Sequence, residues 1–336
     1  AGAALQSAGT VTITGADATN RFTLGNAASG YGYYRLAGGT LTSARLTVAG
    51  NTFAGATGIF EQTGGSVTLA TWAVISQGAG NSLVDVSGGD FNVGTNFALN
   101  HAASAYSVVN VRGTGTITKT GSTLISLMQG NASSTGNVGV VNVNSGGTLV
   151  ISAGGVSNGN GTGSSGNVAL LNFNGGTLKT GAASTVVFNI TGAALTASSG
   201  AYAYSGGATI DTNGFDSTLA GSLRAPTGEG VQSIAVSNGG SGYLSAPIIK
   251  ISGGSGVGAT AVANMVDDGT GNNTFSIGSI TITSPGTGYV NTDVLTLSFG
   301  DNAGLYTAQA VLGAVAFNGG NVSGGLTKTG AGKLTL

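Results

Sequence analysis

The chain has 336 residues, of which 64 are glycine, 40% are hydrophobic and only 6% are charged. Ten Lys and Arg residues against eleven Asp and Glu residues give a net charge of -1. The chain therefore lacks the positive field that binding to nucleic acid or to an anionic membrane needs. It contains no cysteine, which excludes disulfides and thiolate metal sites. No apolar run approaches the roughly 20 residues of a membrane helix, so we expect no membrane insertion by this segment.

The first expected strand covers residues 10–14, where Val11 and Ile13 alternate with threonines between two glycines. No window of the chain has a convincing 3.6-residue apolar period, which predicts an all-β protein. The chain starts at Ala1 without a charged leader, and Thr, Ser, Asn and Gly dominate its polar residues. We interpret it as an exported segment whose signal peptide has been removed.

A glycine-rich corner motif repeats from about residue 36 to residue 224. In residues 142–151, an alternating strand reaches a glycine pair, turns and leaves as a second alternating strand. Further copies occupy residues 35–41, 62–67, 86–91, 112–117, 172–178 and 204–209. The second glycines of successive corners, from Gly39 to Gly207, are 26, 24, 26, 32, 29 and 31 residues apart. Repeats at this period predict a β-solenoid of stacked coils, with glycine at corners that need positive φ.

Asparagines recur at the ends of the expected strands. They are Asn51, Asn81, Asn110, Asn142, Asn144, Asn172 and Asn174. Stacked amides can form a hydrogen-bonded ladder along a solenoid. Alternatively, each asparagine can cap its own turn. Both interpretations are structural, and the local turn role is the preferred one.

The composition changes near residue 225, and all three prolines lie within the next sixty residues or so. Residues 233–251 and 279–297 are two copies of one unit: a strand, a Gly-x-Gly-Tyr turn and a second strand. We expect Tyr243 and Tyr289 to anchor these turns. The pattern predicts an inserted β domain at 225–314, between solenoid coils at 1–224 and a resumed coil at 315–336. Without the insertion, the step from Gly207 to Gly320 is 23 residues, close to one coil.

Residues 323–336 resemble the signature of the autotransporter-associated β-strand repeat, a glycine pair followed by Leu-Thr-Lys-Thr-Gly-x-Gly-x-Leu-x-Leu. Residues 207–214 resemble the segment that often precedes this signature. The resemblance implies a large exported bacterial surface protein whose extended region is a right-handed parallel β-helix. It therefore implies an extracellular or cell-surface location. With the residue patterns, it predicts an all-β, right-handed parallel β-helix (β-solenoid) with a small β insertion domain.

Residues that carry catalytic chemistry are sparse. A β-helix that cleaves polysaccharides needs two or three carboxylates close to a Lys or Arg. Asp85, Asp90 and Arg112 are the best such group, because both acids flank one corner and the arginine lies about one coil later. Glu61, Asp211 and Asp216 are isolated in the sequence. The only histidine, His101, has no acidic or histidine neighbour and is expected to be an ordinary turn residue.

The polar loop between the two Gly-x-Gly-Tyr units contains adjacent acids, Asp267 and Asp268. It lacks the alternating acidic positions of a calcium loop. We therefore expect no metal site and no cofactor. Since no convincing catalytic group emerges, we also expect that the protein is not an enzyme.

Aromatic residues are candidates for glycan binding, because their rings stack on the faces of sugars. Such rings also close the ends of solenoids or form interfaces. The candidates, expected to be exposed, are Tyr31, Tyr33, Tyr34 and Trp72, with Tyr202 and Tyr204 as further members. They favour a surface adhesin, or a glycan-binding passenger region with a cell-surface or matrix polysaccharide as partner, as the alternative function.

The two ends of the solenoid are the candidate assembly interface. The strand with Val11 and Ile13 and the final strand with Leu334 and Leu336 lack charged, proline-rich or helical caps. We expect copies of the chain to bind head to tail, which builds a filament when the contact does not close into a ring. The favoured function is thus a structural subunit of a bacterial surface fibre. A β-helical lyase or hydrolase is the third hypothesis.

Overall fold

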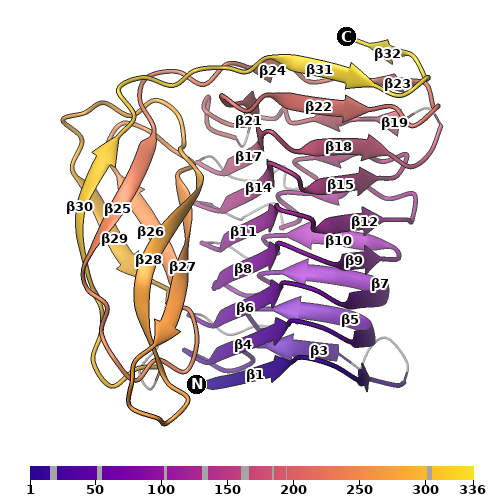
Figure 1. The fold of residues 1–336 in the computed structure, drawn as a ribbon. Coiled ribbons are helices and arrows are strands. Elements are labelled where there is room, and N and C mark those ends of the chain that lie inside the picture. Colours follow the sequence, from indigo (N-terminus) through magenta and orange to yellow (C-terminus); the bar gives the residue numbers. More distant parts are fainter. Residues whose placement is uncertain are drawn as a thin grey trace.

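The computed structural model describes residues 1–15, 21–50, 55–101, 104–130, 135–159, 166–183, 185–193, 195–300 and 305–336. All regular secondary structure in these ranges is β-strand. Two large parallel sheets form a β-solenoid, with antiparallel strands packed along one side (Figure 1). The expected all-β solenoid is confirmed. Across the same ranges, no helix suited to crossing a membrane occurs.

The first solenoid sheet has nine parallel strands. Each coil contributes one strand, so sequence order is also spatial order. In that order they are β1 (Gly2–Gln6), β4 (Tyr31–Leu36), β6 (Thr57–Gln62), β8 (Asn81–Val86), β11 (Tyr106–Val111), β14 (Val138–Asn144), β17 (Val168–Asn174), β21 (Gly200–Ala203) and β24 (Leu223–Arg224).

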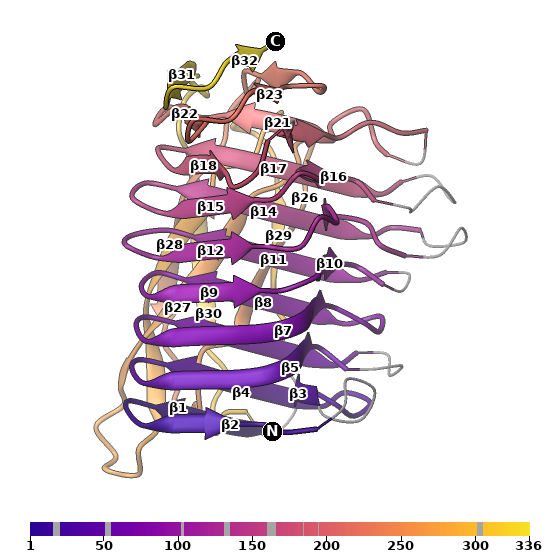
Figure 2. The same cartoon turned by 90° about the vertical axis from the view of Figure 1, so that its right-hand side faces the viewer.

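The second solenoid sheet has 14 strands, because several coils contribute two segments to it. They are β2 (Thr10–Thr12), β3 (Arg21–Leu24), β5 (Thr40–Val48), β7 (Ser66–Ile75), β9 (Asp90–Val93), β10 (Asn96–Leu99), β12 (Thr116–Lys119), β13 (Ile125–Ser126), β15 (Thr148–Ile151), β16 (Val156–Ser157), β18 (Thr177–Thr180), β20 (Phe188–Asn189), β22 (Ala208–Asp211) and β31 (Leu326–Thr329). Figure 2 shows its coils stacked from one end to the other. A small third sheet adds β19 (Thr185–Val186), β23 (Ser217–Thr218) and β32 (Leu334–Thr335).

The strand register agrees closely with the period of the glycine corners. Partners across the second sheet are, coil by coil, Thr40, Ser66, Asp90, Thr116, Thr148, Thr177 and Thr209. Their spacings match those of the corner glycines except at the last step. Thr177 directly follows Gly176, whereas Thr209 lies two residues after Gly207, so this coil is one residue longer. An earlier coil also exists, because Thr10 pairs with Thr40.

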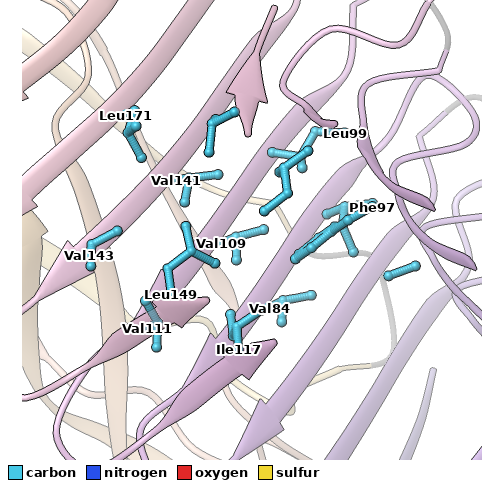
Figure 3. Packing of buried hydrophobic residues seen from close by; sticks show 14 of the residues in the cluster. Val84, Phe97, Leu99, Val109, Val111, Ile117, Val141, Val143, Leu149 and Leu171 are labelled. Carbon is cyan, nitrogen blue, oxygen red and sulfur yellow. The ribbon is translucent and has the colours of Figure 1, made fainter. Parts of the chain in front are cut away.

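The interior of the solenoid is a continuous apolar core built from alternate residues of both sheets. Val84, Val109 and Val141 are register partners in the first sheet, and Ile117 and Leu149 are partners in the second. All five side chains are buried and converge in Figure 3. An isolated coil would leave the apolar side chains at its edges exposed to solvent, so their burial depends on the coils above and below.

One glycine of each corner adopts the expected conformation. Gly39, Gly65 and Gly89 have φ angles of 83°, 71° and 77°. Residues with a Cβ reach this region only at a steric cost. The glycine pair therefore allows each coil to turn tightly between its strands in the two sheets.

Residues between β24 and β31 form two antiparallel sheets beside the solenoid, and their strands run roughly along the stacking axis (Figure 1). One sheet pairs β25 (Val231–Asn238) with β30 (Val311–Phe317). The other has the order β28 (Phe275–Ser284), β27 (Thr260–Asp267), β26 (Ile248–Gly253) and β29 (Leu295–Phe299). We call these six strands the side module. The chain returns to the solenoid at β31, which pairs in parallel with β22.

The return to the solenoid lies later in the chain than the motif at residues 317–320 indicates. Phe317 pairs with Val231 in the side module, because the apolar alternation of residues 311–317 extends one long strand, β30. Leu326 then pairs with Ala208, so the corner of the returning coil is formed by Gly324 and Gly325.

The two Gly-x-Gly-Tyr turns have matching structures. Gly240 and Gly242 in the first, and their counterparts in the second, Gly286 and Gly288, all have φ between 69° and 80°. Tyr243 and Tyr289 are 0% and 2% exposed. The phenol oxygen of Tyr243 accepts a 2.8 Å hydrogen bond from the Ala310 amide. The expected anchoring of these turns by tyrosine is confirmed.

Candidate functional site

The side module covers the outer face of the first solenoid sheet. A second apolar cluster, separate from the solenoid interior, fills the contact between them. Its buried solenoid members include Tyr31, Ile59, Leu83, Tyr106, Val108, Val140 and Leu170, and its side-module members include Tyr243, Ile248, Val262, Ile277 and Leu305. Strands such as β11 are therefore buried on both faces, which explains their nearly continuous apolar sequences.

An asparagine ladder runs up this outer face. Asn142 Nδ2 donates to Asn110 Oδ1 at 2.8 Å, and Asn172 Nδ2 donates to Asn142 Oδ1 at 3.0 Å. The ladder also bonds to the side module, since Asn142 Nδ2 contacts Thr260 Oγ1 at 2.9 Å and Asn172 Nδ2 contacts Ser284 Oγ at 3.2 Å. The preferred turn-capping role is therefore wrong for these three asparagines. Asn51 lies outside the described residues.

In the lower coils, the strand positions that align with Asn110 are occupied by charged residues. We call this set of aligned positions the register column. Asn110 pairs with Asp85, Asp85 with Glu61, and Glu61 with Arg35. Here the side module stands away from the sheet and leaves a cleft of about 580 Å³. We call it the interface cleft. Its solenoid wall includes Tyr33, Arg35, Ile59, Glu61, Leu83, Asp85 and Arg112, and its side-module wall includes Leu244, Pro247, Val262, Met265, Asn273 and Phe275.

One ion pair in the interface cleft is tight. Arg112 Nε donates to Asp85 Oδ1 at 2.9 Å, and its Nη2 donates to Oδ2 at 2.7 Å. This two-bond geometry is the strongest form of a guanidinium–carboxylate contact. The hydrogen bond to Asp85 raises the pKa of Arg112. Because both oxygens of Asp85 bond to Arg112, the two side chains hold each other in place in the wall of the interface cleft.

A second ion pair is loose. Arg35 Nε lies 3.6 Å from Glu61 Oε1, which is beyond hydrogen-bonding distance. The other Glu61 oxygen accepts a hydrogen bond from the Tyr33 hydroxyl. Burial, and then the charge of Glu61, raise the pKa of Tyr33, so this phenol remains a neutral donor. Arg35 and Glu61 thus keep hydrogen-bonding capacity toward the cleft.

The structure brings together only part of the acidic group expected from the sequence. Asp85 and Arg112 meet, but Asp90 is exposed at the start of β9 and does not line the interface cleft. Glu61 takes its place as the second carboxylate, which the sequence interpretation missed. A signal was present: Arg35, Glu61 and Asp85 each precede the first glycine of a corner by three residues.

The expected exposure of several aromatic residues is wrong. Tyr31 and Tyr34 are 5% and 6% exposed, and Tyr202 and Tyr204 are also buried. The side module covers Tyr31, whose hydroxyl donates to the Ala246 carbonyl at 2.6 Å, and Tyr34 points into the solenoid core. Tyr33 is half-buried and lines the interface cleft.

Trp72 and His101 form a small cluster on the second sheet. Trp72 is half-buried, with the Arg45 guanidinium 5.3 Å from the centre of its ring. The His101 ring lies 6.2 Å from the Trp72 ring. Burial and the nearby Arg45 charge lower the pKa of His101, so the imidazole is neutral near pH 7. The Trp72 ring therefore already packs against two side chains.

The residues expected at an assembly interface lie at the two ends of the solenoid and differ in their exposure. Val11 is 36% exposed and Ile13 is half-buried at the lower end, where β2 pairs with β5. At the upper end Leu336 is 82% exposed, whereas Leu334 packs on the core. A hollow of about 620 Å³ opens there, with Ala203, Leu219, Leu223, Leu326 and Leu336 among its lining residues.

A buried lysine and an exposed lysine adopt the same local arrangement. Lys119 is 2% exposed and pairs with the core residue Val93, and its Nζ donates to the Gly121 carbonyl at 2.6 Å. Lys328 is exposed at the upper end and pairs with the core residue Ile210. Its Nζ donates to the carbonyl of Gly330, again two residues ahead, at 2.5 Å. Both lysines precede Thr-Gly, so the upper end repeats an arrangement that a further coil covers at Lys119.

Lys119 predicts an unusual pH dependence of stability. Burial lowers its pKa to about 8, from an unfolded value of about 10.4. Below about pH 8 the folded state bears the full cost of a buried charge, so stability should rise between about pH 8 and 10.4. We expect Lys119→Met to be more stable than the parent by about 3 kcal/mol at pH 7, an advantage that disappears by about pH 10.5.

Chemical denaturation at several pH values measures this difference. Lys179→Met is a matched control, because Lys179 lies on β18 with its side chain 37% exposed. A pH-independent difference between the parent and Lys119→Met would contradict the prediction. The buried tyrosines also affect stability: above about pH 10 the tyrosines of the unfolded chain ionise, and the folded protein loses stability. Subtracting the parent values removes this effect.

The fold defines this chain as a β-solenoid protein with an antiparallel side module. Comparisons with protein-family models, curated proteins and solved structures found no match. Among the described residues, no group of three or more His, Asp or Glu side chains is placed to hold a metal ion.

Proposed function

We propose that this protein is a structural, non-enzymatic β-solenoid subunit of a bacterial surface fibre, and that copies stack head to tail. The observation that carries the proposal is the upper end of the solenoid. There an apolar hollow and Lys328, in the arrangement that Lys119 adopts under another coil, present a surface that fits a further coil. The strand edge of β31 extends this surface with unpaired backbone groups in the described chain.

The extracellular location and the relation to autotransporter-associated β-strand repeats are parts of the same proposal. The low charge, the Thr-, Ser-, Asn- and Gly-rich composition and the Thr-Lys-Thr-Gly phrase at residues 327–330 support them. That phrase is placed in the last coil, where Gly324 and Gly325 form the corner that precedes Leu326. Non-enzymatic function is supported by Asp85, whose oxygens are both bonded to Arg112.

Electron microscopy of the purified protein at low and high concentration tests the stacking. We expect filaments whose axial repeat is about 45 Å, the length of nine strands about 4.8 Å apart. Leu336→Lys should abolish them, because a charge would enter an apolar contact, while Leu334 is left in place because it packs on the core of its own chain. Val311→Lys is the matched control, since Val311 is 55% exposed on the side module.

A mixing experiment tests the polarity of the contact. Val11→Lys with Ile13→Lys blocks only the lower end, whereas Leu336→Lys blocks only the upper end. A head-to-tail contact joins unlike surfaces, so an equal mixture of the two variants should give dimers and nothing longer. Isolated rods at every concentration of the parent protein would overturn the proposal.

A further inference from the structure

We infer that the interface cleft binds a short neutral oligosaccharide between the solenoid and the side module. This function goes beyond the proposed structural role. The cleft volume of about 580 Å³ lies within the range of small-ligand pockets, roughly 300–1,000 Å³. Solenoid and side module both line it, so a ligand inside would contact two walls.

The residues of the register column differ between the upper coils, where the side module is bonded to this face, and the lower coils, where the face remains open. In the upper coils, Asn142 and Asn172 use their amides for the ladder and for bonds to Thr260 and Ser284. In the lower coils the column consists of charged residues, and within the described ranges no side-module residue hydrogen-bonds to Arg35 or Glu61. These groups therefore face the cleft and can bond to a ligand.

The charges of the cleft favour a neutral polyhydroxyl ligand. Arg35 and Arg112 balance Glu61 and Asp85, so no net charge attracts an ionic ligand. The 3.6 Å gap between Arg35 Nε and Glu61 Oε1 leaves a donor and an acceptor side by side. A sugar hydroxyl both donates and accepts, so one hydroxyl, or two on adjacent carbons, satisfies both groups.

The cleft also contains apolar side chains, which suit the C–H faces of a sugar ring. Ile59 and Leu83 lie two residues before Glu61 and Asp85 on their strands, on the same face of the sheet. Both are buried, with 1% and 5% of their surface exposed, and they form the apolar base of the cleft beside the charged residues. Phe275 and Met265, which are only partly buried, line the cleft from the side module. A pyranose presents C–H faces and a hydroxyl rim, and its C–H face packs on these two side chains.

Binding can be measured on the full chain with an array of neutral oligosaccharides, followed by titration calorimetry of the strongest. Tetragalacturonate is the charged comparison. We expect at least one neutral tetrasaccharide to bind, and Glu61→Gln to weaken it about tenfold or more, because it replaces a charged acceptor. Phe275→Ala should also weaken it. Asp90→Asn, which removes an exposed acid outside the cleft, should leave binding unchanged.

The outcomes separate the inference from its alternatives. No neutral binder on the array would overturn it, as would binding that survives both Glu61→Gln and Arg35→Met at parent strength. Preferential binding of tetragalacturonate would overturn the neutral class of ligand. Thermal unfolding of each variant shows whether the fold is retained, and failure of filament formation leaves this result unaffected.

Discussion

Gly89→Ala is expected to destabilise the solenoid by about 3–5 kcal/mol, at the upper end of single-residue effects. Gly89 has a φ of 77°, which alone is unfavourable for alanine. In addition, a Cβ there would lie 2.2 Å from the carbonyl oxygen of Gly65 in the coil below. That oxygen accepts a hydrogen bond from the Asp90 amide, so the two coils cannot separate without losing it. Urea denaturation, followed by far-ultraviolet circular dichroism, measures the loss.

Gly269→Ala distinguishes the two causes. Gly269 has a φ of 75°, but a methyl group at this position would have no neighbouring atom within 4 Å. Its replacement therefore carries only the conformational cost of about 1–2 kcal/mol. A loss at Gly89 no larger than that at Gly269 would show that neighbouring coils are not in the close contact described.

Asn142→Leu is expected to destabilise the protein by about 3 kcal/mol. The change removes three hydrogen bonds of a fully buried side chain, to Asn110, Asn172 and Thr260. It leaves Asn110 Oδ1 without that donor in a buried position, and an unsatisfied buried group costs about 1–3 kcal/mol. The loss of the bond to Thr260 should also loosen the side module, which hydrogen exchange of β27 amides would detect.

Asn92→Leu is the matched control for the ladder. Asn92 is half-buried on β9 in the second sheet and donates one hydrogen bond, to the Val67 carbonyl, at 3.2 Å. We expect a loss of about 1 kcal/mol or less there. A double-mutant cycle of Asn142→Leu with Thr260→Val isolates the link to the side module, and a coupling energy near zero would contradict it.

The period of the coils could be predicted from the sequence because it depends on local chemistry. A corner needs positive φ, glycine reaches it without a Cβ clash, and alternating strands on either side specify which residues face the core. The spacing of Gly39, Gly65 and Gly89 therefore equals the register spacing of Thr40, Ser66 and Asp90. The anchoring tyrosines of the side module followed from a similar local pattern, a turn with two glycines before Tyr243 and Tyr289.

The burial of the outer face was decided only by the tertiary structure. As a candidate glycan-binding residue, Tyr31 is expected to be exposed, yet its hydroxyl donates to the carbonyl of Ala246, 215 residues later in the chain. No local pattern records which face a distant segment covers. For the same reason, the asparagine ladder was distinguishable from turn capping only once the register had placed Asn110, Asn142 and Asn172 side by side.

The interface cleft depends partly on the local sequence repeat and partly on tertiary contacts. The sequence alone determines that Arg35, Glu61 and Asp85 occupy one position relative to their corners, so stacking must align them. Only the tertiary structure decides that this column lies under the side module, that Arg112 pairs with Asp85, and that Asp90 turns away on the second sheet. The physical reason is that alignment follows from a local repeat, whereas enclosure depends on contacts between segments far apart in the chain.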